Sequence, residues 1–171
     1  GVVGQMFLAL LAALAVFTSW KWQAAPRPAE HPSAAFDRSL SAWVTLLLVV
    51  QLVFGAIQRH VAGGLHIHIT LAVIVILAAI TLGVRLWGIY TASPFLQRIG
   101  TALISVASLQ LLLGIAALIA TGASAGILPQ PAYSYIIATL HQTVGAALLA
   151  LTVFAAVWIH KLAGAQTIKP S

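Results

Sequence analysis

The sequence predicts an all-α, polytopic membrane protein: a four-helix bundle built from a parallel two-helix repeat, with one additional N-terminal transmembrane helix. Of the 171 residues, 61% are hydrophobic and only 6% are charged, whereas soluble domains carry about 25% charged residues. So few charges cannot cover a surface that faces water, and a lipid bilayer is therefore the predicted solvent. The chain also contains five long apolar runs and an internal repeat.

The five apolar runs have about the length needed to cross the hydrocarbon core of a bilayer, which takes roughly 20 helical residues. Each run is expected to be helical, because backbone groups in lipid must find hydrogen-bond partners within their own segment. The expected spans are residues 1–20, 40–58, 65–87, 99–121 and 136–160.

Polar connections divide the chain into four parts. The first part is the first span, residues 1–20. Residues 21–38 form a proline-bearing cytoplasmic linker, and residues 39–161 hold the four spans of the predicted bundle. Within the bundle, Ser93-Pro94 is a typical helix start before the fourth span. Residues 162–171 are expected to be a cytoplasmic tail.

The basic residues predict how the chain crosses the membrane, because lysine and arginine are enriched in cytoplasmic loops. Seven of the eight lie in or beside connections that alternate onto one face, and Arg59 alone lies on the other. The N-terminal end of the first span is therefore expected to face outward and the C-terminus to be cytoplasmic. The scattered positions also argue against nucleic acid as a partner, because such binding needs a basic patch.

Composition also limits the chemistry of the chain. Cysteine is absent, which excludes disulfides, thiolate catalysis and zinc–thiolate sites within these residues. The sequence contains no glycine-rich phosphate loop, nucleophile elbow or paired carboxylates. Histidine is therefore the only strong metal-ligand type within the predicted spans.

The four later spans form a parallel repeat. QLVFG at 51–55 parallels QLLLG at 110–114, and HITLA at 68–72 parallels HQTVG at 141–145. Each unit is a helix with Gln-x-x-x-Gly, an outer connection, and a helix that opens with histidine. Because both units have the same orientation, the repeat predicts a pseudo-symmetry axis along the membrane normal.

The sequence of the first span aligns with that of the fifth span. Residues 2–10 (VVGQMFLAL) resemble residues 143–151 (TVGAALLAL), and the position equivalent to His141 falls immediately before Gly1. We therefore expect the first span to be the last helix of an earlier, similar unit.

His68 and His141 open equivalent helices, so the repeat places them at equal depth. An imidazole inside a bilayer is costly, which makes an intramembrane histidine a functional hypothesis by default. Two neutral imidazoles that face each other across a bundle are what axial ligation of a haem iron requires. The alternative is that these residues only pack or hydrogen-bond the helices. Four small residues would leave room for a flat macrocycle, namely Ala72, Gly145, Gly55 and Gly114.

Three further polar residues lie at the same end of the predicted bundle. His66 is the alternative ligand to His68, since side chains two apart on a helix point about 200° from each other, but the repeat favours His68. Arg59 and His60 end the second span. They are either interfacial polar residues or a clamp for haem propionates, because arginine suits bidentate carboxylate pairing.

A mononuclear zinc site is less favoured than a haem. The chain has two acidic residues, Glu30 and Asp37, and both are predicted on the face opposite to the histidine cluster, where they cannot complete a zinc site there. His31 and His160 are expected on that opposite face as solvated or interfacial residues.

The order of these motifs resembles the haem A synthase family. QLVFGAIQRH, GLHIHITLAVIV, LQLLLGIAALIATG and LHQTVGAALLAL follow one another within residues 40–160. That family has two homologous four-helix halves, with Gln-x-x-x-Gly on odd helices and haem-ligating histidines near the outer ends of even helices. The resemblance makes the four later spans the C-terminal half.

The resemblance implies that this half binds a b-type haem for electron transfer, with His68 and His141 as ligands. The N-terminal half would hold haem O, whose methyl group is oxidised to the formyl group of haem A during cytochrome oxidase biogenesis. The family's catalytic glutamate belongs to that half, so no catalytic residue is expected here. The implied location is the bacterial inner membrane.

Two other hypotheses stay open at this point. The chain could be a haem-binding or haem-free accessory subunit of a respiratory or photosynthetic complex. It could also be a b-type cytochrome anchor that passes electrons between a quinone and a partner subunit.

Overall fold

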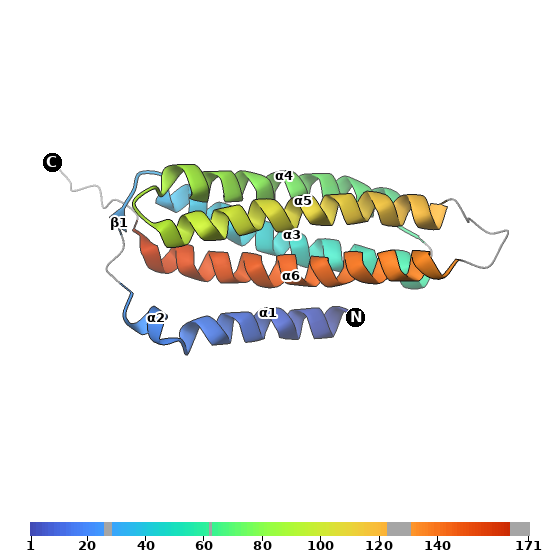
Figure 1. Ribbon diagram of the computed structural model, residues 1–171, viewed down its shortest axis with the longest axis horizontal. Coiled ribbons are helices and arrows are strands. Elements are labelled where there is room, and N and C mark those ends of the chain that lie inside the picture. Colours follow the sequence, from blue (N-terminus) through green and yellow to red (C-terminus); the bar gives the residue numbers. More distant parts are fainter. Residues whose placement is uncertain (26–28, 62, 123–130, 165–171) are drawn as a thin grey trace.

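The protein is a helical bundle in which one short pair of parallel strands is the only sheet within residues 1–25, 29–61, 63–122 and 131–164, the part that the computed structural model describes (Figure 1). In chain order the elements are α1 (Val2–Phe17), α2 (Trp20–Gln23), β1 (Ala29–Glu30), α3 (Ala34–Val61), α4 (Leu65–Ile89), α5 (Pro94–Gly122), α6 (Ala132–Leu162) and β2 (Ala163–Gly164). The strands pair Ala29 with Ala163 and Glu30 with Gly164.

Helices α3 to α6 form a closed ring. Each packs against the next along the chain, and α6 closes the ring by packing against α3. The pairs α3/α5 and α4/α6 therefore lie on the diagonals. Helix α1 runs alongside α6 on the outside of the ring (Figure 1). The prediction of an all-α chain with a bundle of four long helices is confirmed.

The four ring helices are long and apolar enough to cross a membrane, over 25 to 31 residues each. This supports a multi-pass membrane protein in contact with the lipid bilayer. Helix α1 spans 16 residues, slightly below the usual range of about 17–25. Its role as a fifth span stays a prediction.

The helices extend beyond the predicted spans by several residues. α3 begins at Ala34 and not at residue 40, and α2 occupies the start of the predicted linker. The apolar pattern marks only the part of a helix that suits hydrocarbon, whereas polar end turns are helical once they find partners. Ser19 gives one example, because its hydroxyl accepts a hydrogen bond from the Trp22 N–H and caps α2. Residues 26–28 and 165–171, in the predicted linker and tail, lie outside the described part.

The inward-facing stripes of the four helices change character halfway along the bundle. In what we call the closed half, they are fully buried and mostly large and apolar: Val44, Leu48, Val75, Ala79, Leu82, Leu103, Ala107, Leu148, Thr152 and Ala155. In what we call the open half, the same stripes continue with half-buried residues that are small or polar: Gln51, Gly55, His68, Ala72, Gln110, Gly114, His141 and Gly145.

A buried ion pair lies at the far end of the closed half. Asp37 on α3 is completely buried, and its carboxylate accepts hydrogen bonds from Nε of Arg85 on α4 at 2.5 Å and from the Tyr90 hydroxyl at 2.7 Å. Burial, and then the bond to Asp37, raise the pKa of Tyr90 far above its ordinary value. The hydroxyl therefore stays protonated and continues to donate. As predicted, Asp37 lies at the end of α3 remote from His68 and His141, the end at which His31 packs against Tyr90.

Helices α4 and α5 approach most closely at two glycines of the closed half. A Cβ added to Gly100 would stand 2.5 Å from the carbonyl oxygen of Gly83, and one added to Gly83 would stand 2.8 Å from that of Gly100. Small residues at a crossing let two membrane helices pack backbone against backbone. This contact fixes the spacing of the two units of the repeat.

Gly100→Ala is expected to lower the free energy of unfolding by about 2 kcal/mol, because the added methyl group overpacks the crossing. Chemical denaturation of the purified protein in detergent measures this change. Gly88→Ala on α4 is the matched control, since a Cβ there meets no heavy atom within 4 Å. Equal unfolding free energies for the two variants would contradict the close approach.

Candidate functional site

His68 and Gln51 form one half of the candidate site, where α4 begins beside α3. Gly64 precedes α4 with a left-handed backbone (φ 79°) that favours glycine, so His68 lies in the first turn of the helix. The side-chain Nε2 of Gln51 donates to the His68 carbonyl oxygen at 2.9 Å and lies 3.1 Å from the imidazole Nδ1. A Cβ on Gly55 would stand only 3.2 Å from Cε1 of His68. The imidazole is therefore positioned by Gln51 and packs against the α3 backbone at Gly55.

The second half of the site repeats this arrangement between α5 and α6. Nε2 of Gln110 lies 3.4 Å from Nε2 of His141, and a Cβ on Gly114 would stand 3.1 Å from Cε1 of that imidazole. A Cβ on Gly145 would come within 2.9 Å of Nε2 of Gln110. Each glycine thus keeps space for the histidine or for the glutamine beside it.

The sequence repeat is therefore a repeat of contacts. In both units a glutamine reaches the histidine of the next helix, and the glycine four residues later receives the imidazole. The two histidines come from α4 and α6, which lie on a diagonal of the ring, so they approach its interior from opposite sides.

Three polar atoms of these pairs are buried without a hydrogen-bond partner among the described residues. They are Nδ1 of His141 and the side-chain oxygens of Gln51 and Gln110. An unpaired buried polar group costs about 1–3 kcal/mol. A free imidazole nitrogen can bind a metal ion, and a glutamine oxygen can accept the hydrogen of the other ring nitrogen. The amide nitrogens of the two glutamines, and not their oxygens, face the imidazoles. Ligation through the other ring nitrogen therefore requires that each amide turn its oxygen toward the ring.

The small and half-buried residues around the two histidines suit a flat cofactor better than a packed core. Protein interiors are normally close-packed, yet the inward residues of the open half are only half-buried. The positions one turn beyond the histidines carry Ala72 and Gly145, which leave volume in the interior. A glycine beside each imidazole, a diagonal pair of histidines and an unpartnered ring nitrogen together fit a haem with two axial histidines.

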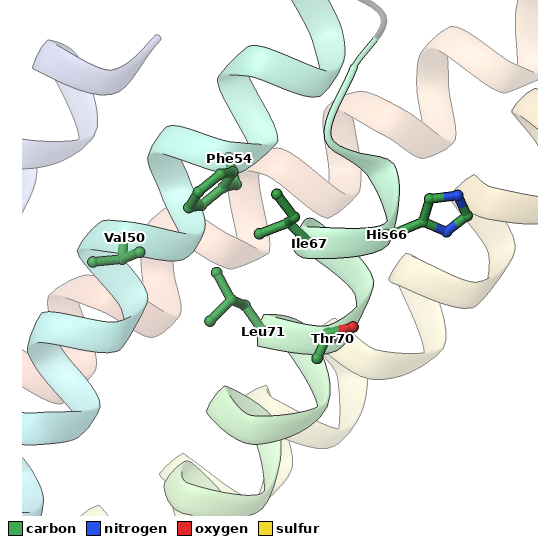
Figure 2. Close-up of a pocket in the computed structure, with 6 residues that line it drawn as sticks. All are labelled: Val50, Phe54, His66, Ile67, Thr70 and Leu71. Carbon is green, nitrogen blue, oxygen red and sulfur yellow. The ribbon is translucent and has the colours of Figure 1, made fainter.

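His66 occupies a different place from His68. It is exposed and belongs to the wall of an open groove of about 490 Å³ between α3 and α4. Figure 2 shows the apolar side chains of this groove directed toward one another, while the His66 imidazole points away from them. The groove is lined by Val50, Phe54, His66, Ile67, Thr70 and Leu71. Among the hydrogen bonds of the described residues, His66 has no contact like that between Gln51 and His68.

Arg59 and His60 lie at the end of α3, and both are exposed. The guanidinium of Arg59 donates to the side-chain oxygen of Gln142, which directly follows His141 on α6. This contact brings Arg59 to the rim of the site, across the seam between the two units.

Sequence reasoning did not assign a role to three of the contact residues. Gln51 and Gln110 appear in the repeated motif, and their spacing from glycine was the one signal that they face the same neighbour as the glycine. No local signal marks Gln142 as the partner of Arg59, because the two are 83 positions apart.

A metal site built only from protein side chains has no support in the described part of the chain, where no group of three or more histidine, cysteine or acidic residues comes together. Two histidines suffice for a haem, because the macrocycle supplies the other four ligands.

Comparison with protein-family models, with curated proteins and with solved structures gave no match for this chain. The resemblance to the haem A synthase family therefore stays a hypothesis that rests on the motifs and their contacts.

Gly114→Ala is expected to displace the His141 imidazole and leave His68 in place, and Gly55→Ala should do the reverse. Each added Cβ falls 3.1–3.2 Å from the imidazole it faces, closer than most carbon contacts allow. Nuclear magnetic resonance of isotope-labelled histidine side chains measures the displacement as a change in chemical shift. Gly88→Ala should change neither signal. Unaltered His141 signals in Gly114→Ala would contradict the packing.

Proposed function

We propose that this chain binds one b-type haem between His68 and His141 and relays electrons through it, as the electron-transfer half of a haem A synthase-like membrane oxidoreductase. One observation carries the proposal. The contact among glutamine, glycine and histidine occurs twice, at the same end of the bundle, and both copies face a half-buried interior.

Each residue of the site has a part in holding the cofactor. His68 and His141 would each offer one neutral imidazole nitrogen to the iron, and a haem held in this way would supply one-electron transfer. Gln51 and Gln110 would orient the rings once their amides turn the side-chain oxygens toward the second ring N–H, because that hydrogen bond fixes the tautomer. Gly55 and Gly114 let the rings lie against the backbone, which keeps the interior free for the macrocycle. The packed closed half below the site limits the entry of water.

The reaction proposed for the whole enzyme is the oxidation of the haem O methyl group to the formyl group of haem A. That oxidation would take one oxygen atom from water and release four electrons and four protons, and the haem site of this chain would carry the electrons, one at a time, to an electron acceptor. The described open half contains no carboxylate near the histidines, since Asp37 lies at the opposite end and pairs with Arg85. The chain is therefore assigned electron relay, and catalytic residues are assigned to a partner half.

A second candidate function is also supported, because a histidine site without a carboxylate beside it is also what a simple electron carrier needs. In that case the chain is a b-type cytochrome or accessory subunit of a respiratory or photosynthetic complex. In both cases we place the histidine end at the outer face of a bacterial inner membrane, because seven of the eight basic residues are predicted on the other face.

The purified protein is expected to give a reduced-minus-oxidised absorption spectrum of a b-type haem with two histidine ligands. His68→Ala and His141→Ala should each abolish this signal, since one axial ligand is lost. His66→Ala should retain it and serves as the matched control, because its imidazole lies outside the Gln51 contact.

A second substitution guards against misfolding of the alanine variants. His141→Met keeps a possible iron ligand and should shift the absorption bands to those of a histidine–methionine haem. A wild-type protein without bound haem would overturn the proposed function. A signal that survives in His68→Ala and is lost in His66→Ala would overturn the choice of ligand.

Deletion of the gene distinguishes the two candidate functions. If the chain is part of a haem A synthase-like enzyme, cells without it should lose haem A and accumulate haem O, as measured by chromatography of extracted haems. A complementing plasmid with His66→Ala should restore haem A. Unchanged haem A in the deletion strain would exclude the synthase and leave the cytochrome subunit.

A further inference from the structure

The two units of the repeat differ at the outer rim of the site, although their inner contacts match. The repeat relates α3 to α5 and α6 to α4, so the seam where α3 packs against α6 corresponds to the seam where α5 packs against α4. Both pairs of helices are in contact. At the rim of the first seam Arg59 donates to Gln142. The positions that correspond to Arg59 and Gln142 in the repeat are Leu118 and Ile69. At these two positions the first seam carries a cation and an amide, whereas the second carries two apolar side chains.

The cation at this rim has no acidic partner within reach. The chain contains two acidic residues, Glu30 and Asp37. Asp37 lies 22 positions before Arg59 on the same helix, a separation of about 33 Å along a helix that rises roughly 1.5 Å per residue. Glu30 belongs to β1, which precedes α3 at that same remote end. Among the lysines and arginines within the described residues, Arg59 alone lies at the end of the bundle that holds His68 and His141.

A porphyrin with two propionates on one edge has the same asymmetry as this rim. One of its edges carries two carboxylates, and the opposite edge carries apolar substituents. Leu118 and Ile69 are 42% and 38% exposed, so an apolar edge could cover them. A guanidinium near an apolar interior is the preferred partner of a carboxylate, because it donates two parallel hydrogen bonds.

We infer that Arg59 selects one of the two possible orientations of the haem, with the carboxylate edge at the α3/α6 seam and the apolar edge at the α4/α5 seam. This inference rests on the proposed function. Gln142 acts as a positioning residue, since its side-chain oxygen accepts from Arg59 and holds the guanidinium beside His141. His60 is exposed and has no assigned contact, so it is not required for the orientation.

The test compares two haems in the full chain. Haem b and its dimethyl ester, which lacks the carboxylate charges, are titrated into the purified haem-free protein in detergent. The wild type is expected to bind haem b about tenfold more tightly than the ester, the difference expected of one charge-assisted pair. Arg59→Gln should lose this preference, by binding haem b about as weakly as the ester. The matched control, Arg98→Gln, changes an exposed arginine at the opposite end and should keep the preference.

Exchange of the rim residues tests the orientation itself. The double variant Arg59→Leu with Leu118→Arg moves the cation to the other seam. It should keep the preference for haem b and reverse the haem in its site, which changes the pattern of haem methyl resonances in the paramagnetic spectrum of the ferric protein.

Failure of this inference can be told apart from failure of the proposed function. A wild-type protein that binds haem through two histidines with equal affinity for both forms would overturn the role of Arg59 and leave the haem site standing. The role of Arg59 is likewise overturned if Arg59→Gln retains the tenfold preference, or if the double variant keeps the wild-type resonances. Absence of binding for both haems in the wild type would instead overturn the haem site.

Discussion

Polar groups inside a bilayer have to find partners within the protein, and this constraint explains both polar layers of the bundle. At one end, the carboxylate of Asp37 is completely buried and is satisfied by Arg85 and Tyr90. At the other end, Gln51 and Gln110 reach the two central histidines. The carboxylate of Asp37 is fully paired, whereas the glutamine–histidine layer leaves three buried atoms without partners; other such atoms, among them Nε of Arg38, lie near the first layer. The unpaired atoms of the glutamine–histidine layer agree with the proposed cofactor site, because buried polar groups normally have partners.

The closed half of the bundle supplies most of the packing, and the open half holds the proposed binding site. The closed half has large buried side chains and the close glycine crossing of α4 with α5, so it can hold the helices in register without help from the other half. The open half continues the same helical stripes with glycine, alanine, glutamine and histidine, which pack less and leave volume. Rigid helices anchored at one end can thus present two imidazoles at a fixed separation at the other, as a site of low reorganisation requires.

The internal repeat makes the inner contacts of the two units equivalent, whereas the residues at the outer rim differ between the units. Duplication places equivalent ligands at equal depth, which suits the two faces of a haem. Its edges are not equivalent, and the pair Arg59 with Gln142 has only Leu118 and Ile69 as counterparts. In the proposed haem site, symmetric ligation with an asymmetric rim would let a duplicated fold bind an asymmetric cofactor in one orientation.

The sequence by itself determined the membrane class, four of the helices and their pairing into two units, because apolar length and a repeated motif are local properties of the chain. It also identified His68 and His141 as equivalent positions. Only the tertiary structure decided which side chains meet. The helix ends, the partner of Asp37, the separate surroundings of His66 and His68, and the contact of Arg59 with Gln142 all depend on neighbouring helices. Such contacts join residues far apart in the chain, and the periodicity of one helix does not show which residues of another helix pack against it.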